Sequence, residues 1–111
     1  MSKDTVLKYS TMRQKVKERI DKIVNALKNM EEVKRVILFG SLVKSNKDKG
    51  FDIDLYLEEN KPISKRDKRK IKELIDDIAG IYTVDLIFDS EISEDFRKTI
   101  KREGMVLYEK G

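Results

Sequence analysis

The sequence contains no cysteine and no histidine, and it has a single proline. Without cysteine, the chain cannot form a disulfide scaffold, a thiolate zinc site or a cysteine nucleophile. Without histidine it lacks the commonest general base, so any catalysis must depend on carboxylates, lysines, hydroxyl groups or a metal ion. No apolar run approaches the roughly 20 residues that span a membrane, and the first residues lack the apolar core of a signal peptide. We therefore expect a cytoplasmic protein with no membrane partner.

Charged residues, by contrast, are abundant. They make up 41% of the 111 residues, and apolar residues make up 39%. A chain of this length and composition is typical of one globular domain with a modest core and a highly charged surface. The net charge of +4 favours anionic partners, such as a nucleotide or a nucleic acid, without choosing between them.

Hydrophobic periodicity predicts helices that alternate with strands. Strands are expected over 33–39, 51–58, 81–88 and 105–109, with a loop over 44–50. A first helix is expected over 9–30, a second between Ser64 and Gly80, and a third from Ser90 or Ser93 to Gly104. The apolar faces of these helices are formed by Met12, Val16, Ile20, Ile23, Val24 and Leu27, by Ile71, Leu74, Ile75 and Ile78, and by Phe96 and Ile100. This order predicts an α/β domain, in which a small mixed β-sheet packs against helices.

Two aspartates stand in the second predicted strand, where aspartate is disfavoured. Asp52 and Asp54 are two residues apart, so their side chains leave the same face, about 6.6 Å apart along the strand. Asp85 lies in the third strand and joins them if the two strands are neighbours. Three such carboxylates repel one another, and divalent cations relieve this repulsion. A pair of Mg²⁺ ions between them could hold both reacting oxygens of a phosphoryl displacement. A D-x-D pair by itself is also typical of a polar, solvated strand face.

The strand before these aspartates ends at Gly40 and Ser41. A glycine at this point lets the backbone approach a ligand closely, and a helical turn that starts at Ser41 would direct free N–H groups at an anion. The Ser41 hydroxyl is a further donor, and Lys44 could bring positive charge to the same phosphates. The strand–turn–loop–strand order therefore predicts a nucleotide site that combines this turn with the aspartates.

Gly40 and Ser41, then Asp52 and Asp54, then Asp85 on the next strand form a pattern that resembles the nucleotidyltransferases of the DNA polymerase β superfamily. The likeness is strongest to the minimal nucleotidyltransferases, the MNT domains of prokaryotic MNT–HEPN toxin–antitoxin pairs. The ending, FRKTIKREGMVLYE, also resembles the end of that family. The resemblance implies a polymerase β palm-like fold, with one nucleotidyltransferase domain over 1–111. An N-terminal helix would lie within 1–30 and the catalytic core within 33–109.

The resemblance also implies roles for the site residues. Asp52, Asp54 and Asp85 would hold two Mg²⁺ ions, and Asp85 would help to deprotonate the acceptor hydroxyl. Gly40, Ser41 and Lys44 would bind the triphosphate, although the family usually has arginine where Lys44 stands. The implied reaction transfers AMP from ATP to a tyrosine of a HEPN-type RNase toxin, so that this chain acts as the antitoxin.

Two other functions stay open from the sequence. The chain could neutralise a partner by contact alone, with a weak or inactive site. It could also bind nucleic acid through the seven basic residues between Lys61 and Lys72, although no aromatic residues interleave with them to stack on bases. We interpret Lys65, Lys68, Arg69 and Lys72 as a solvated helix face. Tyr56 shares the strand face of the aspartates, and packing is a more common role for it than stacking on a nucleobase; Glu58 is expected at the surface.

Overall fold

The computed structural model describes residues 14–44 and 52–110. Its elements, in order, are α2 (Gln14–Lys28), β1 (Val33–Phe39), α3 (Ser41–Lys44), β2 (Asp52–Glu59), α4 (Lys65–Ala79), β3 (Thr83–Phe88), the 3-10 helix η1 (Asp89–Glu91), α5 (Glu94–Glu103) and β4 (Met105–Glu109). This order confirms the predicted α/β fold. The predictions for residues 9–13 of the first helix, for the loop over 45–50 and for Phe51 lie outside the described residues.

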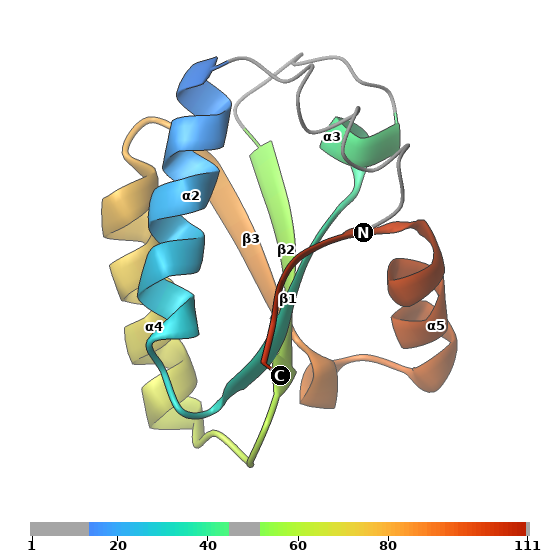
Figure 1. Ribbon diagram of the computed structural model, residues 1–111. Helices are drawn as coiled ribbons and strands as arrows, with labels where there is room; N and C mark the ends of the chain where they lie inside the picture. The colour runs from blue at the N-terminus through green and yellow to red at the C-terminus, as the bar shows by residue number, and fades with distance from the viewer. Residues whose placement is uncertain (1–13, 45–51, 111) are drawn as a thin grey trace.

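The four strands form one mixed sheet in the order β3-β2-β1-β4 (Figure 1). β1 pairs antiparallel with both β2 and β4, whereas β2 and β3 are parallel. Parallel neighbours need a long crossover connection, and α4 provides it between β2 and β3. This crossover brings the third predicted strand directly beside the second.

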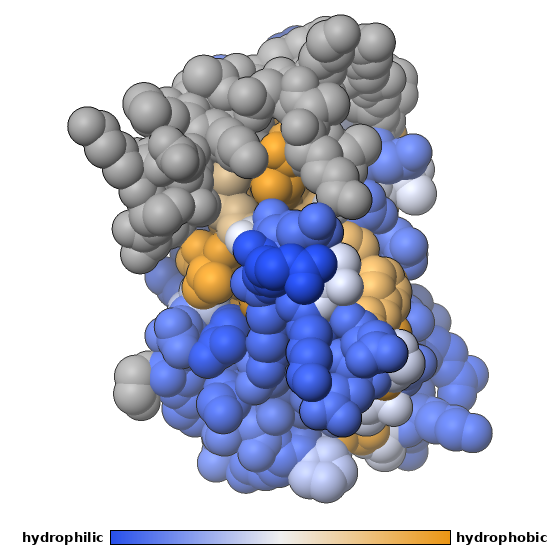
Figure 2. All heavy atoms as spheres, turned by 90° about the vertical axis from the view of Figure 1, so that its right-hand side faces the viewer, coloured by the Kyte–Doolittle hydropathy of each residue, from blue (hydrophilic) through white to orange (hydrophobic). Residues whose placement is uncertain are grey.

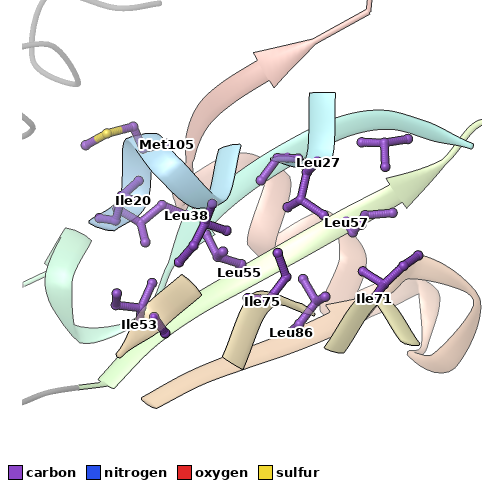
Figure 3. Close-up of a cluster of buried hydrophobic side chains, with 14 of the residues drawn as sticks. Ile20, Leu27, Leu38, Ile53, Leu55, Leu57, Ile71, Ile75, Leu86 and Met105 are labelled. Carbon is purple, nitrogen blue, oxygen red and sulfur yellow. The ribbon is translucent and has the colours of Figure 1, made fainter. Parts of the chain in front are cut away.

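The main core lies between the sheet and the layer formed by α2 and α4 (Figure 1). Every second residue of β2, namely Ile53, Leu55 and Leu57, points into this core, as the alternation in the sequence predicts. Figure 3 shows these side chains between Ile20 and Leu27 of α2 and Ile71 and Ile75 of α4, with contributions from the other strands. Burial of this apolar surface is the main source of the stability that holds the two layers together.

Among the elements that the structure describes, only α5 packs on the opposite face of the sheet (Figure 1). Ile100 of α5 packs there against Ile37 of β1 and Tyr56 of β2, which forms a second and smaller core. Because Asp52 and Asp54 alternate with the buried residues of β2, they share this face with Tyr56. The side of the sheet that carries the aspartates is therefore covered at one end by α5.

Helix ends follow the predicted capping residues. The Ser64 hydroxyl accepts a hydrogen bond from the Asp67 amide at the start of α4, and the Ser93 hydroxyl accepts one from the Phe96 amide at the start of α5. Gly80 ends α4 with φ of 65° and ψ of −116°, a conformation with positive φ that favours glycine. These caps fix where the helices begin and end relative to the sheet.

Two residues predicted to be buried, and one residue of the predicted third strand, are exposed. The side chains of Leu74 and Phe96 are each 41% exposed, and Ile81 is 73% exposed. Ile81 was expected to open the third strand, but the chain is still turning there after Gly80, and β3 begins at Thr83. For Leu74 and Phe96, the predicted helical period is correct, but the buried stripe of each helix is narrower than predicted, because α4 and α5 each contact the sheet on one side only.

Among the helices that the structure describes, none combines the length and the apolar composition that a membrane span requires.

Candidate active site

The three aspartates predicted from the sequence lie together on the α5 side of the sheet. Because β2 and β3 are parallel and in register, Asp54 lies directly beside Asp85, and Asp52 lies beside Thr83. Neighbouring strands are about 4.8 Å apart, so the Asp54 and Asp85 backbones are close neighbours. The three aspartates, with Thr83 and Val84, line an open hollow of about 410 Å³.

Asp54 is the most enclosed of the three carboxylates. It is half-buried, whereas Asp52 and Asp85 are exposed. Burial raises the pKa of the Asp54 carboxyl above its ordinary value, and the negative charges of Asp85 and Asp52 raise that pKa further. Among the ion pairs of the described residues, none joins a basic side chain to any of these aspartates. The hollow is therefore a site of concentrated negative charge that a cation would stabilise.

Gly40 lies beside this hollow, on the side of β1. Phe39 pairs with Asp54 across the strands, so the next residue, Gly40, lies against the Asp54 carboxylate. A Cβ atom at Gly40 would collide with Asp54 Oδ2, and the Gly40 φ of 81° is itself left-handed. No other residue fits this position without a shift, because both the backbone conformation and the close approach require glycine.

α3 begins immediately after Gly40, as the sequence predicts. The Val43 amide donates to the Gly40 carbonyl at 3.1 Å, which closes the turn. Leu42 and Val43 are buried in the main core and anchor the turn to the sheet. The backbones of Ser41 and Lys44 belong to α3, but their side chains lie outside the described part of the structure. Their predicted contacts with phosphate therefore stay predictions.

Tyr56 and Glu58 continue the aspartate face of β2 but lie beneath α5. Tyr56 has no exposed surface, so it packs in the core and cannot stack on a nucleobase. Glu58 was expected at the surface, but its side chain is only 12% exposed, and it forms ion pairs with Lys34, Arg35 and Lys101. α5 thus divides this sheet face into a closed, structural end and an open end at the aspartates.

The basic face of α4 is only partly solvated. Lys65, Arg69 and Lys72 are exposed, as expected. The Lys68 side chain is 15% exposed and pairs with Glu59, while its ammonium group donates to the Ser90 hydroxyl at 2.7 Å. Lys68 therefore ties α4 to the end of β2 and the segment after β3, which is a structural role that the sequence did not reveal.

A comparison with protein families identifies the family of this chain. A family model described as "Polymerase beta, Nucleotidyltransferase" matches residues 21–111, a range that contains the turn at Gly40 and all three aspartates. The chain belongs to this nucleotidyltransferase family. The resemblance that the sequence pattern indicated is thereby confirmed.

Individual relatives agree with this membership. A protein of Methanocaldococcus jannaschii, described as a candidate protein adenylyltransferase, is 29% identical to this chain over 91 residues, which is 82% of this chain and 92% of the relative. A solved structure of a tri-AMPylated Shewanella oneidensis HEPN toxin in complex with its MNT antitoxin matches with a TM-score of 0.64 and 19% identity, over 83% of this chain and 71% of the matched chain. A toxin–antitoxin structure with AMP-PNP matches with a TM-score of 0.64 and 18% identity, over 84% of this chain and 73% of that chain. At these identities, the structural matches show the shared polymerase β-like fold.

The donor set of this nucleotidyltransferase site suits a hard divalent cation. Carboxylate oxygens are the ligands that Mg²⁺ prefers, and the hollow presents three carboxylates with no basic partner among the described ion pairs. In the part of the chain that the structure describes, no group of three or more acidic side chains is arranged as a ready-made metal site. The carboxylate oxygens of the hollow are therefore suitable ligands for Mg²⁺. The number of bound ions and the residues that bind each ion stay predictions.

Two features of this region were not predicted from the sequence. Thr83 lines the hollow beside Asp52, and its spacing of two from Asp85 was the signal that places both on one face. Beside the carboxylates, a second hollow of about 230 Å³ is lined by Phe39, Gly40, Phe96, Thr99, Ile100 and Glu103. No local pattern marks this second hollow, because it forms only where α5 packs beside the end of β1.

Proposed function

We propose that this chain is a Mg²⁺-dependent nucleotidyltransferase that transfers AMP from ATP to a hydroxyl group of a HEPN-type partner protein, and that it acts as the antitoxin of that partner. The observation that carries this proposal is the register of β2 and β3, which sets Asp54 beside Asp85 in one hollow with Asp52, next to the Gly40 turn. The named relatives support the AMP donor and the HEPN partner.

The Gly40 turn has the properties that triphosphate binding needs. Its backbone lies against Asp54, so a phosphate chain bound at the turn reaches the carboxylates directly. The first amides of α3 lack intrahelical acceptors and can donate to phosphate oxygens. We therefore assign the β- and γ-phosphates to Gly40 and Ser41, with Lys44 as the nearby positive charge, and the α-phosphate to the region of Asp52 and Asp54.

The reaction requires one bond to form and one to break. The acceptor oxygen forms a bond to the α-phosphorus, the bond from that phosphorus to the bridging oxygen of the β-phosphate breaks, and pyrophosphate leaves. Asp85 lies on the β3 side of the hollow, exposed to an incoming acceptor, and it takes the proton of the acceptor hydroxyl. When bound, Mg²⁺ would neutralise the carboxylates and would stabilise the negative charge that develops on the phosphate oxygens. Asp52, Asp54 and Asp85 would hold it.

Isotopic labelling tests the proposal. The chain is incubated with Mg²⁺ and its proposed HEPN-type partner, once with ATP labelled at the α-phosphate and once with ATP labelled at the γ-phosphate. We expect label on the partner only from α-labelled ATP. Label from γ-labelled ATP would show a kinase reaction and would contradict the assignment. Tight binding of the partner with no label from either nucleotide would instead favour an antitoxin that acts by contact.

A further inference from the structure

The hollow between β1 and α5 has a composition unlike that of the aspartate hollow. Phe39, Phe96 and Ile100 make its walls predominantly apolar, whereas Thr99 and Glu103 lie on the same helix, α5. Figure 2 shows that hydrophobic side chains reach the surface between hydrophilic ones on the side of the molecule that carries α5. Its volume of about 230 Å³ is below the range of about 300–1,000 Å³ typical of sites for whole drug-sized ligands. The hollow therefore suits one part of a larger ligand.

Two aromatic rings form the walls of this hollow. The Phe39 and Phe96 rings lie edge to face, with centroids 6.2 Å apart and an angle of 88° between their planes. In this arrangement, the ring that presents its edge keeps both of its faces clear of the other ring. Phe96 is also 41% exposed, although it belongs to the face of α5 that packs toward the sheet. A further planar ring can therefore stack against this pair.

The aromatic hollow adjoins the proposed triphosphate site. Gly40 lines it and is also the residue that lies against the Asp54 carboxylate. Phe39 pairs with Asp54 in the sheet, so the aromatic walls are one strand away from the carboxylates. A ligand with phosphates at the Gly40 turn has its remaining part within reach of the Phe39 and Phe96 rings.

We propose that the hollow between Phe39 and Phe96 binds the nucleobase of the nucleoside triphosphate, an inference that rests on the proposed function. The polar side chains of the hollow add a preference for a base with an exocyclic amino group. The Thr99 hydroxyl already donates to the Asp95 carbonyl at 3.1 Å, so its lone pairs are left to accept, and the Glu103 carboxylate is an acceptor. An amino group donates to such acceptors, whereas a carbonyl group of a base does not.

An aromatic side chain of the acceptor protein is the alternative occupant, and the sheet order argues against it. In the order β3-β2-β1-β4, the aromatic hollow is lined by the end of β1, and Asp85 lies on β3. The acceptor hydroxyl must reach Asp85, on the other side of β2. The leaving pyrophosphate at the Gly40 turn and the acceptor at Asp85 thus lie on opposite sides of the α-phosphate, which is the geometry that an in-line displacement needs.

The test compares the binding of ATP with the binding of inorganic tripolyphosphate, measured by calorimetry without the acceptor protein. Phe96→Ala removes one wall of the hollow, and Leu74→Ala is the matched control, because Leu74 is equally exposed but lies on α4. We expect Phe96→Ala to weaken ATP binding about tenfold, as loss of one stacking partner does, and to leave tripolyphosphate binding unchanged. Leu74→Ala should change neither. Phe96→Leu, which keeps an apolar wall without a ring, should give an intermediate loss.

Several results would overturn the proposal. ATP binding unchanged by Phe96→Ala, or an increase only in the KM for the acceptor protein, would assign the hollow to another occupant. An equal loss of affinity for ATP and for tripolyphosphate would show that the substitution damages the phosphate turn and that the base makes no contact with Phe96. If the unsubstituted protein binds neither ATP nor tripolyphosphate, the proposed function itself fails, and this outcome differs from all the others.

The base preference has its own measurement. ATP should bind more tightly than ITP, whose base carries a carbonyl group in place of the amino group. Glu103→Gln should reduce the difference between the affinities for ATP and ITP, because the glutamine amide can accept a hydrogen bond from an amino group or donate one to a carbonyl group. Equal binding of ATP and ITP by the unsubstituted protein would remove Thr99 and Glu103 from the nucleobase site.

Discussion

Substitution of Gly40 by alanine should destabilise the protein more than the same substitution at Gly80. Both glycines have positive φ, 81° at Gly40 and 65° at Gly80, which residues with a side chain rarely adopt, so both alanine variants incur a backbone strain of about 1–3 kcal/mol. At Gly80, the new Cβ would meet only the guanidinium end of Arg19, at 3.1–3.3 Å, and this flexible group can move. At Gly40, the new Cβ would collide with the Asp54 carboxylate. Overpacking of this kind adds about 1–3 kcal/mol.

The contact with Asp54 can be isolated by a double-mutant cycle. Urea denaturation of Gly40→Ala, Asp54→Ala and the double variant gives each change in the free energy of unfolding. Because Asp54→Ala removes the colliding oxygen, it should recover about 0.5–3 kcal/mol in the Gly40→Ala background. Two results would refute the close approach of the Gly40 turn to the aspartates. One is a loss in the free energy of unfolding for Gly40→Ala that is no greater than the loss for Gly80→Ala. The other is a double variant in which Asp54→Ala recovers none of the stability lost by Gly40→Ala.

Three further substitutions test the electrostatics. Asp54→Asn should raise the melting temperature of the metal-free protein at neutral pH, because the ionised Asp54 carboxylate destabilises the folded state. This destabilisation is complete above the raised pKa of Asp54 in the folded state, and it vanishes as the pH falls below the usual pKa of 3.8. The gain in melting temperature should therefore disappear in acid. Tyr56→Phe should be neutral or stabilise by up to about 1 kcal/mol in urea denaturation, because burial raises the pKa of Tyr56 to about 12 and its hydroxyl has no hydrogen-bond partner among the described residues; a loss above 1 kcal/mol would contradict this. Lys68→Gln should lower the melting temperature more than Lys65→Gln, since only Lys68 is bonded to Ser90; equal effects would show that this bond is not formed in solution.

The elements that the sequence predicted most closely are those with unambiguous ends. β1 and β4 have the predicted bounds, because each is a short apolar run that begins or ends beside a glycine. The start of α4 follows from Ser64, since a serine hydroxyl that accepts an amide hydrogen bond is a local feature of the chain. The residues beside each end determine where these elements begin and end, so these bounds can be predicted from a single sequence.

The parts that could not be predicted depend on contacts between distant segments. The spacing of two put Asp52 and Asp54 on one face, but only the parallel pairing of β2 with β3 sets Asp85 beside Asp54. Tyr56 has the same periodicity as the aspartates, yet it is buried because α5 covers only that end of the sheet. The helical period also marked Phe96 as apolar without showing that it lies at the edge of a hollow.

The most direct test of the central claim, that Asp52, Asp54 and Asp85 form one catalytic site, is the intact mass of the HEPN-type partner after incubation with ATP and Mg²⁺. With the unsubstituted protein, the partner should gain the mass of AMP. Asp52→Asn, Asp54→Asn and Asp85→Asn should each abolish this gain, whereas Asp77→Asn, a substitution of an exposed acidic residue on α4, should leave it intact. A partner that still gains AMP when Asp54 or Asp85 is replaced would contradict the account.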